Sequence, residues 1–197
     1  MKRYFIGVWN LANCVTFLGV TAAVVGICFA QNAKAAMLLL LLAGVCDMFD
    51  GRVARMFPRT EQETKYGIQL DSFADTVSFV IFPAVFLIAQ TRTVWTVIIA
   101  VFYVIAGVTR LCWFDITTDG HTKYFQGMPV TCAAMWLPLL YCIAALAGFS
   151  ATVAAAILIF VMGVLFIANI PVKKPGRTGA LILLGGAVAM ALVLLLT

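Results

Sequence analysis

Apolar runs, each long enough to cross the hydrocarbon core of a membrane, recur along almost the whole chain. They lie near residues 9–31, 35–57, 67–90, 94–114, 130–148, 151–172 and 179–196. A transmembrane helix needs about 20 predominantly apolar residues to span roughly 30 Å of hydrocarbon. Only 11% of the residues are charged, against about 25% in soluble domains, so a soluble fold is excluded. The sequence predicts an all-α, polytopic transmembrane bundle of six to eight helices, seven by this count, folded as one domain over residues 1–197.

The basic residues predict how this bundle sits in the membrane. With the N-terminus in the cytoplasm, eleven Lys and Arg residues fall on the inner side and only Lys34 and Arg92 fall outside. This is the asymmetry of the positive-inside rule. The same orientation puts all eight acidic residues on the inner side, so we expect a polar site that faces the cytoplasm. The net charge of +5 indicates attraction to anionic lipid headgroups, and nothing in the pattern indicates nucleic acid.

Four of the eight acidic residues lie inside or beside two of the apolar runs. Asp47 and Asp50 are three residues apart in the second run, and Asp71 and Asp75 are four apart in the third. An ionised carboxylate at the centre of a membrane helix costs roughly 2.5 to 3.5 kcal/mol, so this cluster needs cations or water. Each pair shares a helical face, and a short loop would make the two helices antiparallel neighbours. The sequence therefore predicts four carboxylates that face one another near the cytoplasmic end.

Converging carboxylates of this kind predict a site for two divalent cations. Ligation by oxygen atoms alone suits Mg²⁺ or Mn²⁺, with Ca²⁺ as a non-native occupant. Such ions can hold a diphosphate and stabilise the charge that develops in phosphoryl transfer. Gly51 and Ala54 share the helical face of Asp47 and leave room for a ligand, while Arg55 can neutralise phosphate charge.

These residues resemble the signature of the CDP-alcohol phosphatidyltransferases. The motif D-x-x-D-G-x-x-A-R stands at 47–55 as DMFDGRVAR, and G-x-x-x-D-x-x-x-D stands at 67–75 as GIQLDSFAD. Enzymes of this family transfer a phosphatidyl group from CDP-diacylglycerol to an alcohol and release CMP. The resemblance implies two divalent ions on Asp47, Asp50, Asp71 and Asp75, with Asp75 also the general base. It also implies a pocket for CDP-diacylglycerol formed by Asn13, Thr16, Gly51, Ala54, Arg55 and Gly67.

Finer features resemble the branch of the family that makes phosphatidylserine. They are NCVTFLG at 13–19, DSFADTVSFVIFPA at 71–84 and YFQGMPVTCAA at 124–134. The resemblance implies L-serine as the acceptor and a homodimer as the assembly. Arg110, at the end of an apolar run, is the expected partner of the serine carboxylate. Ser78 is a further acceptor candidate, and Lys123 and the loop residues Arg59 and Lys65 are weaker ones.

Two stretches depart from the family pattern. Eleven residues separate Arg55 from Gly67, more than the family usually has, so the loop 56–66 is expected to be longer and its role is open. TRLCWFD at 109–115 lacks the second arginine of the serine-using branch and has an aspartate at its last position. Acceptor recognition is therefore matched less closely than the metal site.

Two alternative functions remain open. A sister enzyme that uses glycerol phosphate or inositol phosphate would need additional cations for the phosphate of the acceptor. A transporter that uses the acidic cluster as a cation path would need polar residues in the outer half of the membrane, where the sequence has almost none.

Overall fold

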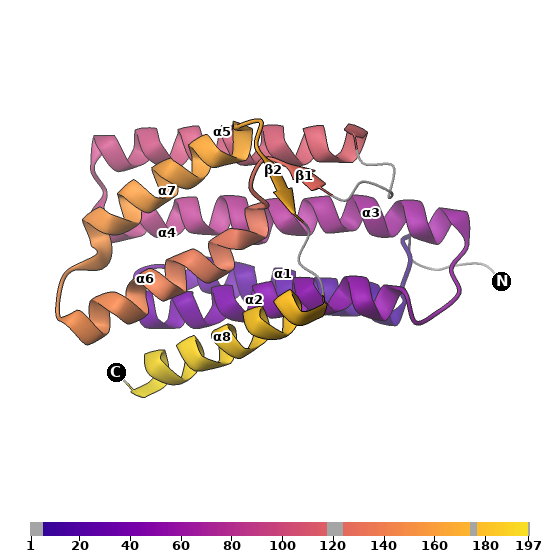
Figure 1. Cartoon of the computed structure of the whole chain (residues 1–197), viewed down its shortest axis with the longest axis horizontal. Coiled ribbons are helices and arrows are strands. Elements are labelled where there is room, and N and C mark those ends of the chain that lie inside the picture. Colours follow the sequence, from indigo (N-terminus) through magenta and orange to yellow (C-terminus); the bar gives the residue numbers. More distant parts are fainter. Residues whose placement is uncertain (1–5, 118–123, 174–176, 197) are drawn as a thin grey trace.

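Helices account for most of this computed structural model, which describes residues 6–117, 124–173 and 177–196 (Figure 1). The elements are α1 (Leu11–Cys28), α2 (Ala33–Ala54), α3 (Glu61–Asp75), the π-helical segment η1 (Thr76–Ile81), α4 (Phe82–Thr91), α5 (Val94–Thr117), β1 (Tyr124–Gln126), the 3₁₀ turn η2 (Val130–Cys132), α6 (Ala133–Ala147), α7 (Ala151–Ile167), β2 (Pro171–Lys173) and α8 (Arg177–Leu196). Because α3, η1 and α4 form one continuous rod, and η2 leads directly into α6, the described residues form seven helical rods. The predicted helical bundle is confirmed.

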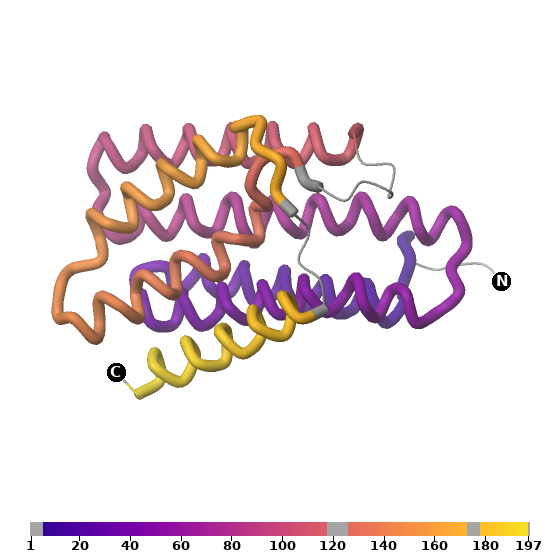
Figure 2. The backbone as a smooth tube through the Cα atoms, in the orientation of Figure 1, coloured from indigo at the N-terminus to yellow at the C-terminus, as the bar shows by residue number. Residues whose placement is uncertain are grey.

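The rods pack in layers around the α3–α4 rod. In Figure 1, α5 and α7 lie on one side of this rod and α1, α2 and α8 lie on the other. Contacts join α1 to α2, α5 to α7, and α2 to both α6 and α8. The backbone tube in Figure 2 shows that α2 and α3 meet at one end of the molecule, while α8 finishes at the other. The connection between α2 and α3 therefore marks one end of the bundle, and the last turn of α3 lies near the middle of the α3–α4 rod.

Five of the described helices are long and apolar enough to cross a membrane. They cover Leu11–Cys28, Glu61–Thr91, Val94–Thr117, Val130–Ala147 and Thr178–Leu196, and α7 is a shorter apolar helix. The 22 residues of α2 would span about 33 Å at 1.5 Å per residue. This helix also contains Asp47 and Asp50, and it is not among the five apolar spans. The length and composition of these helices indicate an integral membrane protein.

The connection between α2 and α3 differs from the sequence prediction. A loop was expected over 56–66, but α2 ends at Ala54 and α3 already begins at Glu61. A capping box starts α3: the Glu63 N–H donates to Thr60 Oγ1 at 3.2 Å, and the Thr60 N–H donates to Glu63 Oε2 at 2.8 Å. This first turn is polar, so hydropathy did not reveal it. The prediction of a loop over 56–66 is therefore wrong for residues 61–66, which are helical.

A small β-ribbon was not predicted either. The strands β1 and β2 pair antiparallel with Gln126 opposite Pro171, and the Gly127 N–H donates to the Ile170 carbonyl at 2.9 Å. The ribbon joins the segment before α6 to the segment after α7. It is the one sheet among the described residues, with three residues in each strand.

The π-helical segment η1 lies in the middle of the α3–α4 rod, directly after Asp75. The Phe82 N–H donates to the Val77 carbonyl, five residues earlier. Tyr103 of α5 is fully buried, and its hydroxyl donates to the Phe79 carbonyl at 2.7 Å. Single π-helical turns within α-helices are rare and occur frequently at functional sites. The neighbouring helix α5 therefore supports an irregular turn next to one of the predicted site residues.

Candidate active site

Three carboxylates from two helices converge beside the middle of the α3–α4 rod, next to η1. Asp47 of α2 and Asp71 and Asp75 of α3 each offer one oxygen, and these oxygens lie within 4.8 Å of one another. Around an octahedral Mg²⁺, with bonds of about 2.1 Å, neighbouring ligand oxygens are about 3 Å apart and opposite ones about 4 Å apart. The three oxygens therefore need only a small adjustment to share an ion.

The fourth predicted carboxylate, Asp50, lies at the edge of this group. It is buried, and its Oδ2 accepts a hydrogen bond from Thr16 Oγ1 of α1 at 2.7 Å. Asp50 lines a cavity of about 10 Å³ together with the other three aspartates and Ser78. A void of this size holds about one water molecule or ion. All four aspartates thus face one small cavity, and Thr16 determines the orientation of one of them.

A larger cavity of about 180 Å³ lies beside the carboxylates, between α1, α2 and α3. Its lining includes every residue predicted for the nucleotide pocket, namely Asn13, Thr16, Gly51, Ala54, Arg55 and Gly67. Asp50 and Asp71 line it as well, so the cavity continues toward the acidic cluster. A Cβ atom added to Gly51 would meet nothing within 4 Å, because this glycine borders open space. The structure therefore brings the six residues together, although they come from three helices.

Asn13 holds a defined orientation at the wall of this cavity. Its Nδ2 donates to the Val8 carbonyl at 2.8 Å. Since a carbonyl only accepts, this contact assigns the amide nitrogen and leaves Oδ1 on the other side. That oxygen lies 3.9 Å from the position that a Cβ atom of Gly67 would occupy. A hydrogen-bond acceptor therefore faces the cavity beside Gly67.

The structure places two of the three residues predicted to bind the acceptor near the carboxylates. Arg110 of α5 is 6% exposed, and its guanidinium lies 5.0 Å from the centre of the Phe114 ring and within electrostatic range of Asp75 and Asp47. Ser78 is buried and lines the ion-sized cavity. Lys123 lies outside the described residues. Two of the three candidates therefore adjoin the carboxylates.

Arg110 also lines a cavity of about 680 Å³ on the other side of α5. This cavity lies between α5, the end of α7 and β1, and its lining includes Trp113, Gln126 and Asn169. The Trp113 Nε1 donates to Gln126 Oε1 at 2.6 Å. A buried cation thus separates the acidic cluster from a cavity large enough for a small polar molecule.

Two residues near the site have positions that the sequence did not predict. Arg59, one of the loop cations, lines the 180 Å³ cavity rather than the acceptor side. Asp115, at the position that departs from the family pattern, accepts a hydrogen bond from Ser72 Oγ at 2.8 Å and lies within electrostatic range of Asp71. The unusual length of the 56–66 connection and the aspartate at 115 were the sequence signals for these positions.

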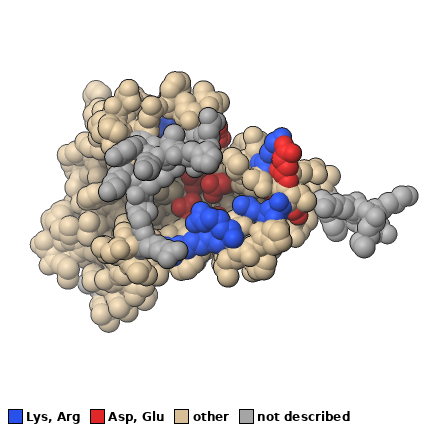
Figure 3. Space-filling model, turned by 45° about the vertical axis from the view of Figure 1, so that its right-hand side comes forward, with Lys and Arg blue, Asp and Glu red and all other residues tan. Residues whose placement is uncertain are grey.

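The charged side chains around the site gather on one face. Figure 3 shows acidic side chains recessed near the middle of this face, with basic side chains beside them. Arg55 is exposed and Arg59 is half-buried at the rim of the 180 Å³ cavity. Cations next to a carboxylate cluster suit a ligand that carries phosphate groups and binds together with divalent ions.

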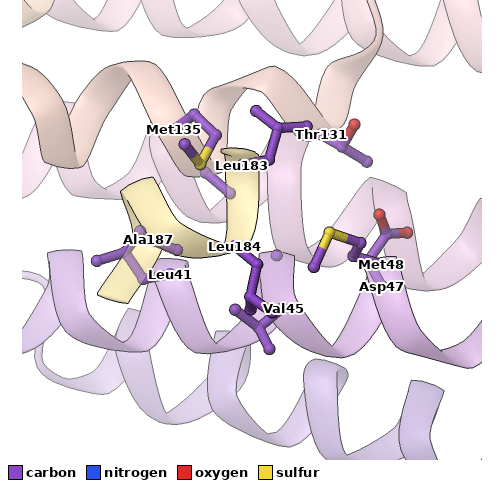
Figure 4. A pocket seen from close by; sticks show the side chains of 11 residues that line it. Leu41, Val45, Asp47, Met48, Thr131, Met135, Leu183, Leu184 and Ala187 are labelled. Carbon is purple, nitrogen blue, oxygen red and sulfur yellow. The ribbon is translucent and has the colours of Figure 1, made fainter. Parts of the chain in front are cut away.

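An apolar groove leads away from Asp47 toward the middle of the bundle. It has a volume of about 170 Å³ and is lined by Leu41, Gly44, Val45, Met48, Thr131, Ala134, Met135, Leu183, Leu184 and Ala187. Figure 4 shows Asp47 and Met48 at one end and Leu41 and Ala187 at the other. The groove therefore joins the acidic cluster to a surface formed by α2, α6 and α8.

The chain is similar to several known proteins. Residues 9–196 match the family model for CDP-alcohol phosphatidyltransferase. The chain is 39% identical over 154 residues to the CDP-diacylglycerol–serine O-phosphatidyltransferase of Saccharomyces cerevisiae, covering 73% of this chain and 52% of the yeast protein. It is 32% identical over 135 residues to the protein of the same name from Mycobacterium tuberculosis, covering 64% and 46%. It is 31% identical over 152 residues to the archaetidylserine synthase of Methanothermobacter thermautotrophicus, covering 76% and 62%. The chain spans about half the length of the curated relatives it matches.

Proposed function

Because this chain belongs to the CDP-alcohol phosphatidyltransferase family, we propose that it transfers the phosphatidyl group of CDP-diacylglycerol to the hydroxyl group of L-serine and releases CMP. One observation carries the proposal. The carboxylates of Asp47, Asp71 and Asp75 converge beside a cavity that is lined by all six residues expected to bind the liponucleotide. Serine as the acceptor is supported by the names of the relatives and by the position of Arg110.

The donor set supports two divalent cations as cofactors. The four aspartates that line the small cavity offer only oxygen ligands, which Mg²⁺ and Mn²⁺ prefer. When bound, such ions would neutralise the diphosphate and the charge that develops on it during transfer. Asp47, Asp71 and Asp75 would hold them directly, and Thr16 would keep the Asp50 carboxylate oriented toward the same cavity.

The remaining steps fall to protein side chains. Asp75 is 9% exposed and would take the proton of the serine hydroxyl as its oxygen attacks the lipid-linked phosphorus. As the new P–O bond forms, the bond to the phosphate oxygen of CMP breaks and CMP leaves. Arg110 would bind the serine carboxylate and hold the hydroxyl toward Asp75, since its guanidinium lies within electrostatic range of that residue. Ser78 would offer a further polar contact in the same cavity.

The two substrates would reach this site by different routes. The 170 Å³ groove is lined almost entirely by apolar side chains of α2, α6 and α8, so it suits the acyl or ether chains of the lipid. Serine would enter from the cytoplasm through the cavity beside Arg110. The cytoplasmic orientation is supported by Arg52, Arg55 and Arg59, which lie near the end of the bundle where α2 and α3 meet.

A CMP-release assay tests the proposal. The purified protein in detergent micelles receives CDP-diacylglycerol, Mg²⁺ or Mn²⁺, and one acceptor at a time: serine, glycerol 3-phosphate, inositol or inositol phosphate. We expect CMP release that requires both serine and the divalent ion, with the double variant Asp47→Asn, Asp71→Asn as the inactive control. CMP release with a phosphorylated acceptor but not with serine would assign the protein to a sister activity. Ion flux in vesicles without CMP release would indicate a transporter.

A further inference from the structure

Arg59 occupies a well-defined position at the rim of the 180 Å³ cavity. It stands between Pro58, whose ring restricts the backbone, and Thr60, the N-cap of α3. The capping box holds Thr60 through three hydrogen bonds with Glu63, between 2.8 and 3.2 Å long. The backbone next to Arg59 is therefore anchored on its C-terminal side, although it belongs to a connection between helices.

The side chain of Arg59, which precedes α3, reaches Gly67 within this helix. Its Nη1 lies 3.3 Å from the position that a Cβ atom of Gly67 would occupy, so the glycine permits this close approach. Arg59 also lines an adjoining cavity of about 320 Å³. Among the described residues, the ion pair within salt-bridge distance is that of Lys65 with Glu61, so no carboxylate there lies within that distance of Arg59. The guanidinium thus remains able to donate to a ligand.

The groups that flank Gly67 form a complementary pair. Arg59 Nη1 and Asn13 Oδ1 lie 3.3 Å and 3.9 Å from the position that a Cβ atom of Gly67 would occupy, so N–H donors and a hydrogen-bond acceptor both adjoin this glycine. The pairing edge of cytosine presents an amino donor at N4 and acceptors at N3 and O2. Uracil presents the reverse at two of these atoms, a carbonyl acceptor at O4 and an N–H donor at N3. The pair around Gly67 therefore matches cytosine and not uracil.

The position along α3 also favours the base over the phosphates. Gly67 lies four residues before Asp71, which is about 6 Å along the helix axis. The acidic cluster, with its ions, would hold the diphosphate. The ribose separates the base from the phosphates by a comparable length, so the base reaches Gly67 when the diphosphate is at the aspartates.

We propose that Arg59 binds the cytosine base of the liponucleotide through O2 and N3, with Asn13 Oδ1 accepting from the N4 amino group. This inference rests on the proposed function, because it takes CDP-diacylglycerol as the donor substrate. It makes the lengthened connection between α2 and α3 a determinant of nucleotide specificity.

Titration calorimetry on the purified protein in micelles tests this proposal, with CMP, UMP and ribose 5-phosphate as separate probes in the presence of Mg²⁺. The wild type should bind CMP more tightly than UMP by about tenfold or more, the size expected for a charged hydrogen bond. Arg59→Ala should weaken CMP by about the same factor, weaken UMP less because uracil shares only the O2 acceptor, and leave ribose 5-phosphate within about twofold. Lys65→Ala, which removes an exposed cation of the same segment, is the matched control and should bind all three probes normally.

A second variant tests the role of the capping box as a positioning device. Thr60→Ala should weaken CMP less than Arg59→Ala does, because it loosens the arginine without removing it. In the Arg59→Ala background the same change should have no further effect on CMP affinity. Thermal melting of each variant separates loss of fold from loss of contact.

The outcomes separate this inference from the proposed function. Unchanged CMP affinity in Arg59→Ala would overturn the role of Arg59 and leave the transferase proposal intact. Equal weakening of CMP and ribose 5-phosphate would also overturn it, since the contact would then be to phosphate. Failure of the wild type to bind CMP at all would overturn both.

Discussion

The nucleotide side and the acceptor side of the site are built differently. The nucleotide side comes from α1, α2 and α3, which follow one another in the chain, and it gathers all six predicted residues in one cavity. The acceptor side depends on α5, on η1 and on segments around the β-ribbon, which lie far apart in the sequence. One predicted residue there, Lys123, lies outside the described part of the chain. Spacing along neighbouring helices thus predicts which residues of the nucleotide side meet, whereas the acceptor side is assembled by long-range packing.

The largest expected effect lies where the two sides meet. Asp75→Asn should lower turnover by about 10² to 10⁴-fold, because the amide cannot accept the proton of the serine hydroxyl. Binding of CMP should change far less, since Asp47 and Asp71 remain. CMP release and CMP titration on the same preparation measure both. Near-normal turnover would show that Asp75 is not the general base. A group on the acceptor side would then have to take the proton of the serine hydroxyl.

The next effect should be confined to the acceptor side. Arg110→Ala should raise the KM for serine by about 10- to 100-fold, as expected when a charged hydrogen-bond partner is lost. The KM for CDP-diacylglycerol should stay within about twofold, because the nucleotide cavity is lined by other residues. Steady-state kinetics with each substrate varied in turn measures the difference. If the KM values for serine and for CDP-diacylglycerol rise together, Arg110 does not act on the acceptor side alone.

A smaller effect is expected on the nucleotide side alone. Thr16→Val keeps the shape of the side chain but removes the 2.7 Å hydrogen bond to Asp50. Loss of this charge-assisted bond should weaken CMP and CDP-diacylglycerol by about 5- to 20-fold. The serine KM should not change. Thr21→Val, at an exposed position one turn and a half further along α1, is a matched control whose hydroxyl bonds only to the Phe17 carbonyl.

The smallest effect on catalysis should come from the support beneath both sides. Tyr103→Phe removes the donor to the buried Phe79 carbonyl of the π-helical segment, at a cost of about 1 to 3 kcal/mol in the free energy of unfolding. Thermal or denaturant unfolding in micelles measures this loss. The KM values for both substrates should change together and only slightly. A large change in one of them would show that η1 belongs functionally to that side.

Several parts of the fold and site could be predicted because their signals are local. Helical spacing alone placed Asp47, Asp71 and Asp75 on facing surfaces, and apolar length alone predicted the helical bundle. The first turn of α3 was missed because polar residues carry no hydropathy signal, although its Thr60–Glu63 capping box was visible in the sequence. The β-ribbon could not be predicted, since each strand has three residues and gains its partner only when α6 and α7 have packed.

By itself, the sequence determined that the chain forms membrane-length helices and that two of them bring their carboxylates together. Both conclusions follow from local physics: apolar length against the thickness of hydrocarbon, and 3.6 residues per helical turn. Only the tertiary structure decided that Thr16 orients Asp50, that Arg110 lies within electrostatic range of Asp75, and that Arg59 reaches Gly67. These interactions depend on how separate helices and their connections pack against one another. Residue spacing within a single helix does not predict that packing.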